Sequence, residues 1–345
     1  MTRATRRLLA GLTAAILAAG GMTVPAGAQT STPPPGQGAE QAIPEPPTFW
    51  RSEWPRTDFT KRDIESWTEI VSGGPGRDGI PALDDPDFLP AKDVDLPPLE
   101  PVVAVVIDGA APRAYPLRYL TWHEIVNDTV AGIPVAVTFC PLCNSAMTFD
   151  RRVDGRVLRF GVTGKLRNSD MVMFDRETES WWQQVIGAAI VGELTGATLR
   201  PIPTWMESWE RFKEREGAMV MAEPALPRAY GTNPYAGYDR SRQPFLYSGA
   251  PPPHGIKPLA RVLRVGDKAW PLDRLRGQTP LREAGITIEW SAGQASALDD
   301  AVIARGRDVG MIRVRGPGGE DVVHDVMFAF AFHAFYPEGQ WMLGG

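Results

Sequence analysis

Short runs of apolar and β-branched residues, separated by turn residues, dominate the hydrophobic pattern of the central part of the chain. Val102–Ile107 ends at Asp108-Gly109, and Ile133–Phe139 runs directly into a cysteine motif. Phe149–Phe160 contains Asp154-Gly155, a pair that supplies the positive φ angles of a tight hairpin turn. The pattern therefore predicts strands that are joined mostly as antiparallel hairpins.

Helical spacing is rarer than strand patterning. Apolar residues recur three and four positions apart in residues 60–71, 117–130 and 205–216, and we expect a helix in each of these segments. Met171–Phe174 and Trp181–Val185 read as a further pair of strands, joined through Asp175 to Thr178. Strands thus outnumber helices, which predicts a fold of the α+β class that is mainly antiparallel β with a few short helices.

The pattern begins again after residue 260. The matching segments are Ala114-Tyr115-Pro116-Leu117 with Ala269-Trp270-Pro271-Leu272, and Ala131-Gly132-Ile133 with Ala284-Gly285-Ile286. We therefore expect two diverged repeat units. In this alignment Gly293 and Ser296 stand opposite Cys140 and Cys143, so a shared fold would not require the two sulfurs.

The N-terminus is typical of an exported protein. Arg3, Arg6 and Arg7 precede the apolar stretch Leu8–Ala19, and small residues end in Ala26-Gly27-Ala28. This is the pattern of a secretory signal peptide. The arginine pair leaves general secretion and twin-arginine export both open. No later apolar run reaches the length of a membrane-spanning helix, so we expect a periplasmic or extracellular protein without a membrane anchor after cleavage.

The predicted organisation follows from these boundaries. In chain order, the segments are a signal peptide at 1–28, a disordered linker at 29–49, an N-terminal helix and irregular segment at 50–101, a first repeat unit with the cysteine motif at 102–223, a Pro/Gly/Tyr-rich connection at 224–260, and a second repeat unit without cysteines at 261–345.

The charge of the mature chain excludes some partners. Removal of residues 1–28 takes away three arginines and no acids, which leaves 33 basic and 41 acidic residues and a formal charge of −8. No basic run or stripe is present. We therefore expect no binding to nucleic acid, which needs a concentrated positive surface.

The strongest chemical signal is the segment Cys140-Pro141-Leu142-Cys143, which holds the only two cysteines of the chain. Pro141 presets φ for a β-turn, and such a turn brings its end residues within about 7 Å, close enough for a disulfide. A bridge that closes so short a loop would contribute only ~2 kcal/mol of chain entropy. A structural bridge, a redox-active pair, a metal site and two unpaired thiols all remain open.

A metal site would need ligands beyond the two sulfurs. His123 lies beside Trp122 and Glu124, and Met147 would share a strand face with Cys143. Cysteine and histidine suit Zn²⁺, whereas thiolate and thioether select Cu(I). His123 is also a candidate for a catalytic role beside the cysteines. An isolated histidine is usually an ordinary hydrogen-bonded residue, and methionine at such spacing is usually core filler.

Several longer motifs resemble a known family, the domain of unknown function 3179 family, from Thr57 to the C-terminus. The motifs are Gly73-Gly74-Pro75, Asp78-Gly79-Ile80-Pro81, Ala114-Tyr115-Pro116-Leu117, Trp122-His123-Glu124-Ile125-Val126-Asn127-Asp128, Thr138 to Ala146, Phe149-Asp150-Arg151 and Asn168 to Thr178. The resemblance supplies no activity. It implies relatives with selenocysteine in the cysteine motif, which favours redox or soft-metal chemistry over a structural bridge.

These observations lead to three functional hypotheses. The first is an extracytoplasmic thiol–disulfide oxidoreductase with Cys140 and Cys143 as nucleophile and resolving residue, which acts on a protein or small-molecule thiol partner. The second is a Cu(I) or zinc protein that uses the same sulfurs with His123 or Met147. The third is a non-catalytic binding module in which a disulfide shapes a loop.

Overall fold

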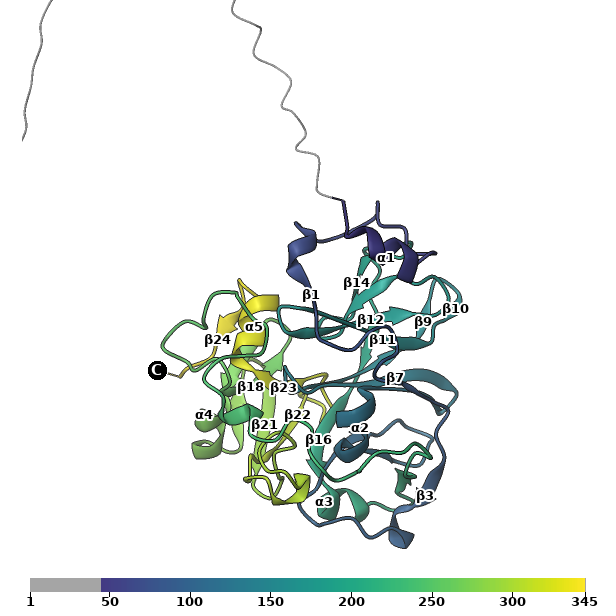
Figure 1. Ribbon diagram of the computed structural model, residues 1–345. Coiled ribbons are helices and arrows are strands. Elements are labelled where there is room, and N and C mark those ends of the chain that lie inside the picture. The colour runs from purple at the N-terminus through teal and green to yellow at the C-terminus, as the bar shows by residue number, and fades with distance from the viewer. Residues whose placement is uncertain (1–44, 345) are drawn as a thin grey trace, which may run out of the picture. The chain divides into compact units, whose positions relative to one another are not determined.

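The strands form five principal sheets, and these are arranged as the blades of a five-bladed β-propeller (Figure 1). The computed structural model describes residues 45–344. The predicted signal peptide and most of the predicted linker lie outside this range. The structure is mostly β, with 36% strand and 14% helix. In the described part, no helix combines the length and the apolar character needed to cross a membrane.

The sheets are numbered here 1 to 5, and their strands are given in spatial order. Sheet 1 contains β1 (Ile70–Ser72), β11 (Phe160–Arg167), β12 (Asp170–Asp175), β13 (Trp181–Gln183) and β14 (Ala188–Val191). Sheet 2 contains β15 (Arg200–Ile202), β8 (Ser145–Asp150), β7 (Ile133–Cys140), β6 (Ile125–Val130) and β2 (Leu83–Asp84). Sheet 3 contains β16 (Thr204–Ser208), β4 (Pro101–Val105), β5 (Arg113–Pro116), β17 (Met219–Met221) and β3 (Phe88–Pro90).

The two remaining sheets come from the C-terminal part of the chain. Sheet 4 contains β23 (Asp325–Phe328), β18 (Arg261–Val265), β19 (Lys268–Pro271) and β24 (Gln340–Trp341), and sheet 5 contains β20 (Leu281–Glu283), β21 (Ile286–Ser291) and β22 (Met311–Arg315). A small hairpin joins β9 (Arg152–Val153) to β10 (Arg156–Val157).

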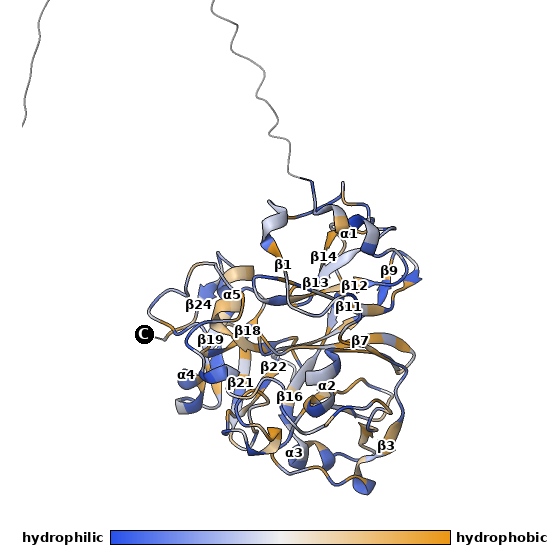
Figure 2. Ribbon diagram, in the orientation of Figure 1, coloured by the Kyte–Doolittle hydropathy of each residue, from blue (hydrophilic) through white to orange (hydrophobic). Residues whose placement is uncertain are grey.

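Helices are short and connect the strands. They are α1 (Thr48–Glu53), α2 (Leu117–His123), α3 (Trp209–Lys213), α4 (Leu272–Gly277) and α5 (Ala329–Phe335), with single 3₁₀ turns at Trp67–Glu69, Ala91–Asp93, Tyr238–Arg240 and Ile303–Arg305. Figure 2 shows hydrophobic colour along β7 and mainly hydrophilic colour on α4. Every residue of β7 after Ile133 is buried, which explains its unbroken apolar sequence.

The predicted architecture of two repeat units is wrong. The strands form five propeller sheets, and one hydrophobic cluster contains residues of both proposed units, from Val103 to Phe332. Sheets 3 and 4 do share a strand order, since each has antiparallel pairs followed by a parallel strand, β17 in one and β24 in the other. The sequence matches around Tyr115 and Trp270 mark these two sheets. The element that recurs is a sheet, and the halves of the chain do not form separate units.

Three predicted helices are also wrong in part. Residues 60–71 contain one 3₁₀ turn and β1, and residues 205–216 are divided between β16 and α3. The predicted helix at 117–130 ends at His123, because Glu124 adopts φ 59° and turns the chain into β6. Both faces of β6 and β16 are largely buried, so apolar residues occupy most positions of these two strands and include pairs three and four positions apart, as in a helix.

Other local predictions are confirmed. Asp154 and Gly155 have φ angles of 48° and 76° in the β9–β10 hairpin, as a tight turn of this type requires. The strands β12 and β13 pair antiparallel as expected. The Gly73-Gly74-Pro75 motif packs closely against Gly164, where a Cβ would lie 1.9 Å from the carbonyl oxygen of Pro75.

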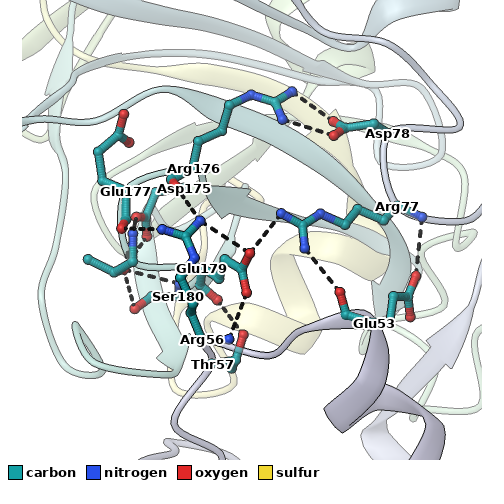
Figure 3. A network of polar contacts seen from close by, with 11 residues as sticks. Glu53, Arg56, Thr57, Arg77, Asp78, Asp175, Arg176, Glu177, Glu179 and Ser180 are labelled. Carbon is teal, nitrogen blue, oxygen red and sulfur yellow. Dashed lines mark hydrogen bonds and ion pairs between the residues drawn. The ribbon is translucent and has the colours of Figure 1, made fainter.

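An aromatic cluster and an ionic network attach the N-terminal segment to sheet 1. The rings of Trp50, Trp54 and Phe59 each make an edge contact with Trp181, at centroid distances of 5.2 to 5.5 Å. Nearby, the buried Glu179 accepts hydrogen bonds from the Arg56 backbone N–H at 3.0 Å and from Arg77 Nη2 at 2.9 Å (Figure 3). This end of sheet 1 is therefore closed by residues more than 100 positions away in the sequence.

Candidate functional site

The cysteine motif forms the loop between β7 and β8. Cys140 pairs with Ser145 across the hairpin, and the Asn144 N–H donates to the Pro141 carbonyl at 3.2 Å. The hydrogen-bonded turn therefore lies one residue later than a turn bounded by the two cysteines. Asn144 completes it with φ 53°, a conformation that asparagine tolerates better than most residues. Both cysteines are free and buried, with 1% and 0% of their surface exposed.

Asp170 completes a cluster with the two sulfurs. The chain reaches it through Asn168 and Ser169, both with positive φ, which turn β11 into β12. One carboxylate oxygen and the two sulfur atoms all lie within 4.8 Å of one another. The two thiols are in contact with each other, and Cys143 Sγ also donates to the Ser169 carbonyl at 3.6 Å.

The Asp170 carboxylate is held on one side only. Its Oδ2 accepts from Gln183 Nε2 at 2.6 Å and from the Val185 N–H at 3.1 Å. Its Oδ1 is buried and has no hydrogen-bond partner of normal geometry in residues 45–344. A buried polar atom is normally paired, so this oxygen can take a further partner, although Oδ1 of the ion-paired Asp239 is unpaired in the same way.

Acids and thiols dominate the electrostatics of this cluster. Burial raises the pKa of Cys140, and the charges of Asp170 and Glu124 raise it further. The pKa of Cys143 lies well above its ordinary value for the same first reason, with added effects of Cys140 and Asp170. Burial also raises the pKa of Asp170 to about 6 and that of Glu124 to about 8. The site therefore resists any net negative charge.

Sheet 4 fixes the position of the cysteine loop. The Phe328 N–H donates to the Cys143 carbonyl at 2.8 Å, and Asn144 Nδ2 donates to the Val326 carbonyl at 2.8 Å. Ser145 Oγ donates to Asp325 Oδ2 at 2.5 Å, next to these backbone contacts. The C-terminal part of the chain thus holds the loop from the side of β23.

A pocket of about 460 Å³ lies over the loop. Leu142, which stands between the cysteines, and Met171, which follows Asp170, contribute to its wall, as does Glu124. The 224–260 connection supplies the other side through Tyr235, Tyr238 and Phe245. Tyr238 donates to the Leu142 carbonyl at 3.0 Å and Tyr235 donates to Glu124 Oε1 at 3.3 Å. The pocket is therefore in direct contact with residues adjoining the cluster.

His123 is buried with both ring nitrogens in use. Its Nδ1 contacts the Pro81 carbonyl oxygen and its Nε2 contacts the Tyr230 hydroxyl, both at 2.7 Å. The carbonyl can only accept, so Nδ1 donates to it and neutral Nε2 accepts from Tyr230. Burial lowers the pKa of His123, in agreement with this neutral form. The structure does not place His123 in the cluster with the sulfurs.

Met147 lies on β8, and its sulfur accepts a hydrogen bond from Arg264 Nη2 at 3.5 Å. A positive guanidinium at the thioether sulfur disfavours a cation at that position. Of the sequence candidates, the structure therefore brings together Cys140 and Cys143 and leaves His123 and Met147 with other partners. Sequence reasoning missed Asp170 and Glu124, although both stand in motifs that carry the family resemblance, Asn168 to Thr178 and Trp122 to Asp128.

Comparison with known proteins yields one match. A family model described as a protein of unknown function (DUF3179) covers residues 77–339, which include every residue of the cluster and most of the pocket. Neither the curated proteins nor the solved structures contain a significant match.

Proposed function

Because the chain belongs to the DUF3179 family, whose description names no activity, we propose a function from the site itself: the protein binds a transition-metal ion through Cys140, Cys143 and Asp170. One observation carries the proposal, namely that the two sulfurs and a carboxylate oxygen lie within 4.8 Å of one another. Two thiolates and a carboxylate are ligands that Zn²⁺ accepts. Three protein ligands leave one tetrahedral position for another molecule.

Charge supports a bound cation. Three groups that can become anionic are buried together, and burial of uncompensated charge is strongly unfavourable. A metal ion supplies the missing positive charge and releases the thiol protons when it binds. Oδ1 of Asp170, which has no hydrogen-bond partner of normal geometry in residues 45–344, gives the ion an oxygen ligand. A carboxylate ligand favours Zn²⁺ over Cu(I), which prefers thiolate and thioether, and the Met147 thioether is already in contact with Arg264.

Thiol–disulfide exchange is the second candidate, supported by the contact between two free thiols at the ends of a short loop. In that reaction the dithiol would pass two electrons and two protons to a partner disulfide, forming one internal disulfide and two partner thiols. Reactive cysteines normally lie in positive, partly exposed surroundings, whereas these are buried among acids. A structural bridge, the third hypothesis, finds no support in the free state of both residues.

The proposed location is outside the cytoplasm. Its support is the arginine-rich start, apolar stretch and small-residue cleavage pattern of residues 1–28. Those residues lie outside the described part of the chain.

Metal analysis tests the proposal. The full chain, purified under reducing conditions and equilibrated with Zn²⁺, should retain about one ion per chain after dialysis. A Cys140→Ser/Cys143→Ser variant and an Asp170→Asn variant should each lose it. Met147→Leu and His123→Gln serve as controls, because neither residue is a proposed ligand, and both should retain the ion.

The result that contradicts metal binding is equal zinc content in the wild type and the double cysteine variant. A wild type without zinc that forms a reversible Cys140–Cys143 disulfide would instead establish the second candidate. Mass measurement after thiol labelling distinguishes these two states.

A further inference from the structure

We infer that the pocket over the cysteine loop binds a small, neutral, largely apolar organic molecule that carries a hydroxyl or carbonyl oxygen. The inference rests on the proposed function and deepens it, because it names the class of molecule that would lie beside the metal site. It follows from the volume of the pocket, the character of its walls and the charges that face it.

The walls are mostly apolar. Ile80, Leu142, Val162, Leu166, Met171 and Phe245 all face the pocket, which encloses about 460 Å³. Ligand pockets of proteins commonly range from about 300 to 1,000 Å³ and combine apolar walls with few polar groups. Phe245 is 46% exposed at this surface although it is a large aromatic residue. The pocket therefore suits the hydrocarbon part of a small molecule.

The polar groups favour a neutral oxygen. Four titratable side chains face the pocket: Glu124, Lys165, Tyr235 and Tyr238. Glu124 has one 3.3 Å contact from Tyr235 and can bind a hydroxyl or, when protonated, a carbonyl oxygen. The Tyr235 hydroxyl donates a hydrogen bond to Glu124, so its oxygen remains free to accept a hydrogen bond from a bound molecule.

Lys165, the only cationic residue among the described residues of the pocket wall, is directed elsewhere. Lys165 Nζ contacts Glu53 Oε2 at 3.0 Å and lies 5.2 to 5.3 Å from the rings of Trp50, Trp54 and Trp181. In the described residues of the pocket wall, an anionic molecule would therefore meet no cationic side chain that is free to pair with it. Such an ion would also have to lose its favourable hydration. Neutral molecules avoid this cost.

The test uses benzyl alcohol and benzoate, which share a ring and differ in charge. Each is titrated into the zinc-equilibrated full chain, and binding is followed by ligand-observed NMR. Benzyl alcohol should bind saturably and at least about tenfold more tightly than benzoate, a difference of about 1.4 kcal/mol. Ala236→Trp, which adds a ring at the pocket wall, should abolish saturable binding. Leu226→Trp, at an exposed site outside the pocket wall, should leave it unchanged.

Three outcomes overturn the inference: binding of benzoate at least as tight as that of benzyl alcohol, unchanged alcohol binding in Ala236→Trp, and absence of saturable alcohol binding to the zinc-containing wild type. Zinc content is measured in each sample, which separates the two proposals. A chain without zinc contradicts the proposed metal site, whereas a chain with zinc but without saturable alcohol binding contradicts the inference about the pocket alone.

Discussion

Replacement of Asp170 by asparagine should make the metal-free protein more stable at neutral and alkaline pH. Asparagine has the same shape as aspartate and keeps an oxygen that can accept from Gln183 Nε2 and the Val185 N–H. It cannot ionise. As a buried carboxylate that binds a metal ion, Asp170 destabilises the fold when it is ionised and the ion is absent, and the substitution removes this destabilisation.

The magnitude follows from the pKa of Asp170, which burial raises from 3.8 to about 6. Between these values the folded state binds more protons than the unfolded chain, so the free energy of unfolding falls as pH rises. Above pH 6 the loss is constant, and two pKa units correspond to about 3 kcal/mol. Asp170→Asn should therefore be more stable than the wild type by up to about 3 kcal/mol at pH 8 and nearly equal to it at pH 4.

Urea unfolding at pH 4 and pH 8, with chelator and reductant present, measures this difference. Asp325→Asn is a matched control, since burial raises the pKa of Asp325 to about 6 as well, but Asp325 lies outside the cluster. Both variants should gain stability at pH 8, while only Asp170→Asn should lose the stabilisation by added zinc, about 2.7 kcal/mol at a hundredfold excess over Kd. An Asp170→Asn protein that is less stable than the wild type at pH 8 would refute the reasoning.

Three further results are expected. Glu179→Gln should lower the free energy of unfolding by about 1 to 3 kcal/mol at pH 7, because it weakens charged hydrogen bonds from Arg56 and Arg77. Hydrogen bonds outweigh burial and lower the pKa of Glu179, so the wild-type advantage should begin to fall as the pH drops below 4.5, and an advantage that stays constant on further acidification would contradict this. The double cysteine-to-serine variant should keep its circular dichroism spectrum but lose about 1 to 3 kcal/mol per site in the metal-free state, because each buried thiol of the main hydrophobic cluster becomes a more polar hydroxyl; unchanged stability would contradict this. Gly164→Ala should cost more than about 2 kcal/mol in thermal unfolding, since its φ is 73° and its Cβ would overlap Pro75, and an unchanged Tm would disprove that contact.

Local sequence determined the strands and turns that depend only on neighbouring residues. The unbroken apolar run before Cys140 became β7, and Asp154-Gly155 became a tight turn because these two residues accept positive φ. The two cysteines were identified as one unit for the same reason, since three residues of separation already place them within reach of each other. The sequence by itself therefore determined the centre of the site.

Tertiary structure decided what surrounds those sulfurs. Asp170 lies 27 residues beyond Cys143, and only the pairing within sheet 1 and the packing of that sheet against sheet 2 bring its carboxylate to the sulfurs. His123 and Met147 were reasonable metal ligands by residue type. The His123 ring is hydrogen-bonded to Pro81 and Tyr230, however, and the Met147 sulfur accepts a hydrogen bond from Arg264. Each of these partners is distant in sequence, so no local pattern could reveal them.

The architecture was decided in the same way. Sequence matches correctly connect the segments around Tyr115 and Trp270, because the same local strand order needs similar apolar and proline positions. They do not show how many sheets lie between these segments or how the sheets pack. The packing of the sheets depends on which buried faces fit together. One example is β8, which packs beside β23, where the Phe328 N–H donates a hydrogen bond to the Cys143 carbonyl. Burial of apolar surface is non-directional, so hydrophobic pattern alone leaves the partner of each face open, and only the folded chain specifies it.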